Sequence, residues 1–295
     1  CGFREASVLA VNSMSKKYSI SRAGMNIADD AMFCTRGFVI RVFDGTLSAE
    51  YSCSEIGEDS FVAIGEALEN IIGETKKRMN INQQPECVPE TKHAAETEYF
   101  TEYEIHPEEM GDDAILSHLD KIRSKTLACD ENVMDCSVVC SYRRLAKRFL
   151  RGADGKILEQ KEQNILWMTS AAMVLVARGE EIKDYYKGYS NLGGAEVLAE
   201  MEADVENNVK CAVALLDSEP IVPGEYECIC TPDVTGMIVH EAFGHGVEMD
   251  MFVKKRALAE QYIGESVASP LVTMHDGAVA AQQTASYLFD DEGTD

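Results

Sequence analysis

A long stretch of strand-like sequence between Asp135 and Tyr189 constrains the fold of this chain more than any other feature. Apolar and polar residues alternate along much of it, which is typical of strands with one buried face. Gly152-Ala-Asp-Gly155 supplies a turn, and a strongly apolar run around Ile165–Val176 indicates a buried strand. The stretch therefore predicts a meander of long strands.

The sequence before the meander mixes both periodicities. Residues 35–53 predict two strands joined at Asp44-Gly45, because this dipeptide supplies the positive φ angles of a tight turn. Apolar residues then recur every three or four positions, which predicts one helix from about Phe61 to Met79 and another near 112–128. Residues 82–112 are polar and acidic and contain three prolines, so we expect a surface connection there.

The period changes again after a glycine pair, Gly193-Gly194. Residues 197–216 carry the longest helical pattern of the chain, so we place a domain boundary near 188–194. Residues 225–230 alternate as a short strand, and Thr231-Pro232-Asp233 is typical of a helix start. We therefore predict a mixed α/β fold with an amino-terminal domain at 1–190 and the start of a second domain at 191–295.

Length, charge and composition exclude several classes of protein. The chain has 295 residues, which suits about two domains. Lys and Arg number 27 against 51 Asp and Glu, and a net charge of −24 argues against direct binding to nucleic acid or anionic membranes. No apolar run reaches the ~18 to 20 residues of a membrane span, so we expect a cytoplasmic protein. Its ten cysteines are scattered, and we expect mostly buried, reduced thiols.

The candidate chemistry lies on the helix that follows Thr231. His240 and His245 bracket Glu241, as in zinc sites where imidazoles bind the metal and the glutamate activates water. The five-residue interval places the histidines about 140° apart on a regular α-helix. A π-type bulge would bring both histidines to one face of the helix. Gly244 lacks a Cβ atom, which would lower the energetic cost of such an irregular backbone. On the residues alone, two unrelated histidines beside a surface glutamate are the favoured interpretation, because a five-residue interval is not a recurrent zinc spacing.

The segment HEAFGHGVEMD resembles the HExxxH signature of the TldD/PmbA metallopeptidases, whose usual form is HEAxGHxxExD. Further similarity lies at Arg36–Val42, at 264–273 and in the Asp-Asp-Glu-Gly-Thr sequence at 290–294. The chain is most similar to the TldD-like subunit, because the PmbA-like partner lacks the histidine motif. The residues that match the signature are His240, Glu241, Ala242, Gly244, His245, Glu248 and Asp250.

The resemblance implies a role for each matching polar residue. His240 and His245 become ligands of Zn²⁺, and Glu241 becomes the general base that acts on a zinc-bound water. Glu248 and Asp250 become groups that orient an imidazole, a task that carboxylates often perform. The third ligand of the family is a downstream cysteine, which we expect beyond Asp295. We therefore expect the chain to be truncated within its catalytic domain and to hold an incomplete site.

The implied function is hydrolysis of small or unfolded peptides, in a dimer of TldD/PmbA family subunits. The implied architecture is a TldD/PmbA-like amino-terminal domain followed by the first part of the metallopeptidase domain. The alternative is a noncatalytic subunit that binds peptides or other proteins. The metal content of the protein distinguishes the peptidase from the noncatalytic subunit.

Overall fold

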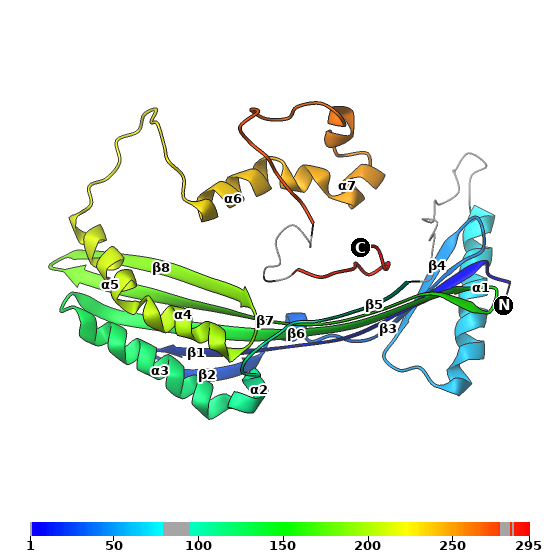
Figure 1. The fold of residues 1–295 in the computed structure, drawn as a ribbon, viewed down its shortest axis with the longest axis horizontal. Coiled ribbons are helices and arrows are strands. Elements are labelled where there is room, and N and C mark those ends of the chain that lie inside the picture. Colours follow the sequence, from blue (N-terminus) through cyan, green and yellow to red (C-terminus); the bar gives the residue numbers. More distant parts are fainter. Residues whose placement is uncertain (1, 79–94, 278–283, 285) are drawn as a thin grey trace. The chain divides into compact units, whose positions relative to one another are not determined.

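The computed structural model describes residues 2–78, 95–277, 284 and 286–295. The chain divides into two compact units (Figure 1). The first contains residues 1–218 together with 282–295, and the second contains residues 219–281. The second unit is therefore an insertion between two segments of the first.

The first unit is built on a sheet whose described part has eight strands. The order is β4-β3-β1-β6-β7-β5, with β2 also paired to β1 and β8 to β7. The neighbours are antiparallel except for the parallel pair β5 and β7. The strands are β1 (Glu5–Ser21), β2 (Gly24–Asp29), β3 (Arg36–Phe43), β4 (Ser48–Cys53), β5 (Ala95–Phe100), β6 (Val133–Ala153), β7 (Lys156–Arg178) and β8 (Glu181–Leu192).

Three long strands run through the sheet. β1, β6 and β7 have 17, 21 and 23 residues, and β6 pairs with the other two along most of its length. Asp154 and Gly155 form the turn between β6 and β7, both with positive φ. The predicted meander with its turn at 152–155 is thereby confirmed.

The main core lies on one face of this sheet. Helix α3 (Asp112–Cys129) packs against β6 and β1, and helix α5 (Val205–Ala214) packs against β7 and β8. The side chains that α3 places in the core are fully buried, as predicted; they are those of Ile115, Leu119 and Ile122. Short helices flank these two: α2 (Pro107–Met110), α4 (Leu198–Ala203) and the 3-10 turns at Ala195–Val197 and Leu215–Asp217.

The helix predicted over 197–216 is interrupted at Asp204. Its carboxylate accepts a hydrogen bond of 2.9 Å from the Tyr189 hydroxyl, which in turn accepts one of 2.6 Å from the amide of Asn208. Tyr189 and Asn208 are both buried. This hydrogen-bond network connects β8 to the junction of α4 and α5. Because buried polar groups need hydrogen-bond partners, the network favours the interruption of the helix at Asp204.

A second, smaller core lies at the other end of the sheet. Helix α1 (Phe61–Arg78) packs against β4 and buries Ile64, Leu68 and Ile72 together with Val42 of β3. The predicted helix is confirmed, although Phe61 and Ile71 of its pattern are exposed. The hairpin of β3 and β4 is confirmed too, with Gly45 at a φ of 98°. The remaining short elements of this unit are 3-10 turns at Ala31–Phe33 and Glu58–Ser60.

The second unit contains α6 (Pro232–Ala242), a 3-10 turn at Gly244–Val247, α7 (Met249–Val253) and a 3-10 turn at Ala259–Tyr262. None of the residues described between 219 and 277 is buried. Pro232 stands at the first helical position and Asp233 in the first turn, as predicted, but the Thr231 hydroxyl does not cap the helix. The strand predicted at 225–230 is wrong, since that segment pairs with no described strand.

Other predictions concern connections, thiols and membranes. Residues 79–94 of the predicted connection lie outside the described residues, and the rest of it contains β5 and α2. The eight described cysteines are all unpaired, but of these only Cys136 and Cys140 are buried. No helix in the described ranges is long and apolar enough to cross a membrane. The division of the chain near residue 190 stays a prediction.

Candidate metal centre

The histidine motif straddles the end of helix α6. The helix ends at Ala242, and Phe243 leaves the helical region with φ −142° and ψ −27°. A 3-10 turn then begins at Gly244. The irregularity expected between His240 and His245 is therefore present, but it is a helix end followed by a tighter turn. The prediction of a π-type bulge is wrong, because residues 232–247 contain none.

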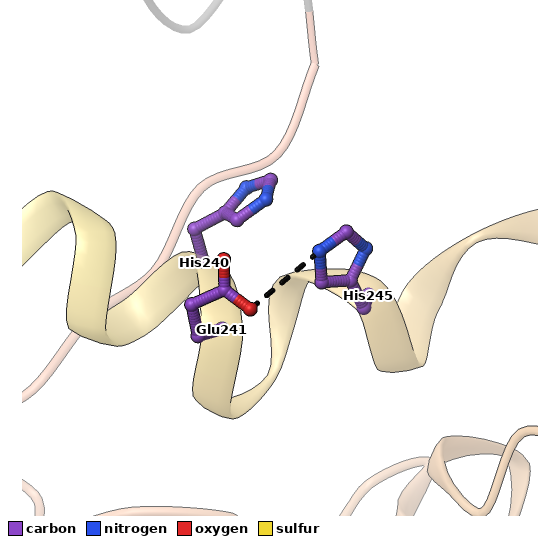
Figure 2. Close-up of side chains that lie close together, drawn as sticks. All are labelled: His240, Glu241 and His245. Carbon is purple, nitrogen blue, oxygen red and sulfur yellow. Dashed lines mark ion pairs between the residues drawn. The ribbon is translucent and has the colours of Figure 1, made fainter.

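This break brings the two imidazoles together (Figure 2). Their ring centroids are 4.5 Å apart, with an angle of 71° between the planes. The Glu241 carboxylate lies beside them, 3.8 Å from Nε2 of His245. One ligand atom from each of His240, Glu241 and His245 lies within 4.8 Å of the others. The convergence that the five-residue spacing required is therefore achieved.

Gly244 has less influence on this geometry than the sequence indicated. Its backbone does not adopt a positive φ, and a Cβ atom at this position would lie 3.6 Å from Nδ1 of His240. That distance is ordinary van der Waals contact. The turn therefore does not require glycine on steric grounds.

The two acidic residues after the histidines have different partners. Glu248 Oε1 lies 2.7 Å from Nδ1 of His245, and this hydrogen bond raises the pKa of His245 above its ordinary value. Asp250 instead accepts a hydrogen bond of 2.5 Å from Lys254, which lowers the pKa of Asp250. Of the two predicted orienting groups, Glu248 thus contacts an imidazole in this structure, and Asp250 contacts a lysine.

The chemistry of the donor set fits a zinc-type ion. Imidazole nitrogens suit zinc and related transition metals, whereas magnesium and calcium prefer oxygen-only shells. Zinc to nitrogen bonds of about 2.0 to 2.1 Å place neighbouring ligand atoms of a tetrahedron about 3.3 Å apart. The atoms here, within 4.8 Å of one another, need only small side-chain rotations to reach that spacing. All three side chains are exposed.

The other histidines do not form a comparable group. His93 lies outside the described residues. His106 caps α2 through its ring nitrogen, and His118 lies 3.2 Å from Glu202. Across the described ranges, His240, Glu241 and His245 are the one set of three or more potential ligands that lie close enough to hold a metal.

Several known proteins match parts of this chain. Residues 223–295 match the family described as the PmbA/TldA metallopeptidase C-terminal domain. A metalloprotease of Methanothermobacter thermautotrophicus is 29% identical over 143 residues, which cover 48% of this chain and 31% of that protein. A metalloprotease TldD homolog of Haemophilus influenzae is 43% identical over 58 residues, or 20% of this chain and 12% of that protein. The matched segments thus span less than a third of these relatives.

Solved structures match along almost the entire chain. A Bacteroides thetaiotaomicron protein described as a modulator of DNA gyrase superposes with a TM-score of 0.65 at 14% identity, over 99% of this chain and 64% of its own. TldE from Thermococcus kodakarensis gives 0.55 at 15% identity, over 99% and 63%. At these identities the likeness shows a shared fold. Residues 223–295 are in addition similar in sequence to the PmbA/TldA metallopeptidase C-terminal domain.

Proposed function

We propose that this chain provides the zinc-binding helix of a peptidase, with His240 and His245 as metal ligands and Glu241 as general base. The observation that carries the proposal is the convergence of the two rings with one carboxylate at the end of α6. The relatives that match this region are named metalloproteases, which supports a metal-dependent peptidase role.

The residues divide the work of hydrolysis between them. A zinc ion held there would supply Lewis acidity toward a peptide carbonyl and acidify a water molecule. Glu241 accepts a proton from the attacking water and passes it to the departing amine, so that the peptide bond breaks and a carboxylate and an amine form. Its carboxylate lies on the histidine side of the helix end, within 3.8 Å of His245.

Glu248 supports the ligand role of His245. Its contact at Nδ1 fixes the orientation of the ring and leaves Nε2 available as the ligand atom. Catalytic zinc sites commonly use three protein ligands and an open position. We therefore expect one further protein ligand besides His240 and His245.

Substrate and assembly follow the same resemblance. We propose small or unfolded peptides as substrates and a second TldD/PmbA family subunit as partner, in the cytoplasm and without direct contact to nucleic acid. TldE, one of the matching structures, is a family member of the kind that could pair with this chain. A noncatalytic peptide-binding subunit is the competing proposal, and zinc content distinguishes it.

Two substitutions test the assignment. Glu241→Gln should keep zinc while peptide hydrolysis falls by a factor on the order of 10² to 10⁴, the usual contribution of a positioned base. His240→Ala should lose zinc and hydrolysis together, because the remaining ligands hold the ion poorly. Zinc stoichiometry and cleavage of an unfolded peptide are measured on both variants.

Glu260→Gln is the matched control, since Glu260 is an exposed glutamate of the same unit on a different turn. It should change neither zinc content nor rate. Full activity in Glu241→Gln would refute the general base, and unchanged zinc in His240→Ala would refute the metal centre. Zinc-free parent protein would favour the noncatalytic subunit.

A further inference from the structure

One face of the sheet in the first unit carries cations from three different strands. Arg41 lies on β3, Lys147 on β6 and Lys161 on β7. The register places Lys161 opposite Phe149 and Phe149 opposite Leu9, so that Lys147 and Lys161 share one face with these apolar residues. In a chain of net charge −24, such a cationic face is locally unusual.

The last ten residues, 286–295, lie on this face and are here termed the acidic strap (Figure 1). Each of the three cations pairs with a different acid of the strap. Arg41 lies 2.6 Å from Glu292, and Lys161 lies 2.6 Å from Asp295. Lys147 pairs with Asp291.

Of these cations, Lys161 depends most on its hydrogen-bond partners, because its side chain is only 2% exposed. An ammonium group has three donors, and all three are used: Glu159 accepts at 2.9 Å, Asp295 at 2.6 Å and the Gly293 carbonyl at 2.7 Å. Burial alone would lower the pKa of Lys161, yet these bonds raise it above its ordinary value. Two of the three acceptors belong to the strap, so its departure would leave this buried charge poorly satisfied.

The strap is also shaped to fit. Phe289 is 1% exposed and packs with Leu9 and Phe149 in a small core of its own. The Asp290 carboxylate accepts hydrogen bonds from the backbone N–H groups of Glu292 and Thr294, both at 2.8 Å, which closes the strap into a compact loop. Phe289 and the acidic side chains of the strap therefore contact the sheet at the same time.

A cavity of about 560 Å³ borders the strap, and Arg41, Lys147 and Tyr287 are among the residues that line it. The acids of the strap keep their outer sides in water, with Asp291, Glu292 and Asp295 at 72%, 57% and 75% exposure. Dissolved ions can thus reach all three pairs. Screening of exposed pairs by salt is strong, because the Debye length falls from about 10 Å at 0.1 M to about 3 Å at 1 M.

We propose that the acidic strap is an ionic clasp that holds residues 286–295 on the sheet and that opens as ionic strength rises. The chain leaves the first unit after Ser218 and returns at Gln282, so the strap belongs to the segment that follows the insertion carrying His240 and His245. Opening of the clasp frees the strap while the sheet itself stays folded. This device stands independently of the peptidase proposal.

Amide hydrogen exchange of residues 286–295, followed by mass spectrometry on the whole chain, tests the clasp. An exposed ion pair contributes a factor of about 1.4 to 5 to a local equilibrium, and three such factors multiply to about 3 to 125. The triple variant Asp291→Asn, Glu292→Gln and Asp295→Asn should therefore speed exchange of the strap about threefold or more. Raising NaCl from 0.1 to 1 M should speed exchange of the strap in the parent protein and have little effect in the variant. Because these acids are exposed, the variant is expected to fold.

The control is a variant with the same charge change elsewhere, Glu260→Gln, Glu265→Gln and Asp276→Asn, in the other unit. It should leave exchange of the strap unchanged, and helix α3 should exchange slowly in every sample. If neither salt nor the three substitutions changed the hydrogen-exchange rate of the strap, the ionic clasp would be refuted. Packing of Phe289 alone would then hold the segment on the sheet.

Discussion

At the scale of single residues, the local contacts of each ionisable group set its chemistry. His245 and Cys140 illustrate two opposite environments. His245 is exposed and hydrogen-bonded to a carboxylate, which favours its protonated form. Cys140 lies in the core, where burial disfavours the thiolate. Each environment predicts a measurable titration.

Glu248→Gln should lower the pKa of His245 toward its ordinary value, because the hydrogen bond to the carboxylate is the main cause of the increase. Protons compete with zinc for the ring, so metal binding in the parent should weaken as pH falls through this raised pKa. NMR titration of the metal-free imidazole measures the shift. Asp250→Asn is the control, since Asp250 contacts Lys254. Equal pKa values in parent and Glu248→Gln would contradict the assigned contact.

Cys136 and Cys140 should resist alkylation in the folded protein. Burial raises the pKa of Cys136 to about 11 and that of Cys140 to about 12, so the reactive thiolate is scarce at pH 8. Exposed Cys34, Cys129 and Cys228 should react first with iodoacetamide. Peptide mass mapping after a short exposure distinguishes them. Rapid labelling of Cys140 without denaturant would show that strand β6 is not packed as described.

At the scale of elements, hydrophobic periodicity predicts a helix or strand correctly where the segment's own sequence determines its structure. The prediction fails where pairing with a distant segment determines it. Helices α1 and α3 were predictable because their apolar faces repeat every three or four residues. Residues 225–230 alternate like a strand but have no partner, and residues 95–100 form β5 because β7 pairs with them in parallel. Strand β1 was not predicted, and its pairing depends on β6, more than a hundred residues away.

The candidate site shows the same division. The identities of His240, Glu241 and His245 were readable from the motif, and so was the need for an irregular turn. The kind of turn was not, because the backbone at Phe243 depends on where α6 ends. The partner of Asp250 was also unpredictable, since Lys254 and the histidines are all within reach along the sequence.

Leu119→Ala in helix α3 should destabilise the first unit by about 2 to 5 kcal/mol, the usual cost of a large-to-small change in a core. Leu119 is 0% exposed and sits in the main core between the helix and the sheet. Urea unfolding followed by circular dichroism measures the loss. Leu258→Ala, at a site that is 67% exposed, should change stability by less than about 0.5 kcal/mol. Equal losses in both would place Leu119 outside the core.

At the scale of the whole molecule, the two units differ in how much they bury. The first contains all the core clusters found in the described residues, whereas none of the side chains between 219 and 277 whose burial is described is buried. Local stability follows buried contacts. The candidate metal centre therefore belongs to the part of the chain with the least internal packing.

Amides of α6 should accordingly exchange hydrogen much faster than those of α3. Addition of zinc should slow exchange from His240 to Val247, because an ion that binds only the folded form stabilises it by mass action. Exchange mass spectrometry with and without zinc provides the measurement. Magnesium is the control metal, since two imidazoles suit it poorly. Equal protection of α6 and α3 in metal-free protein would contradict the contrast between units.

The insertion of one unit into the other has an entropic consequence. With both ends anchored, residues 219–281 form a closed loop even when they are unfolded. Closure of a flexible loop of about sixty residues removes on the order of 4 kcal/mol of chain entropy from the unfolded segment. Anchoring of both ends in the first unit thereby favours the ordered form of a segment whose described residues form no core cluster.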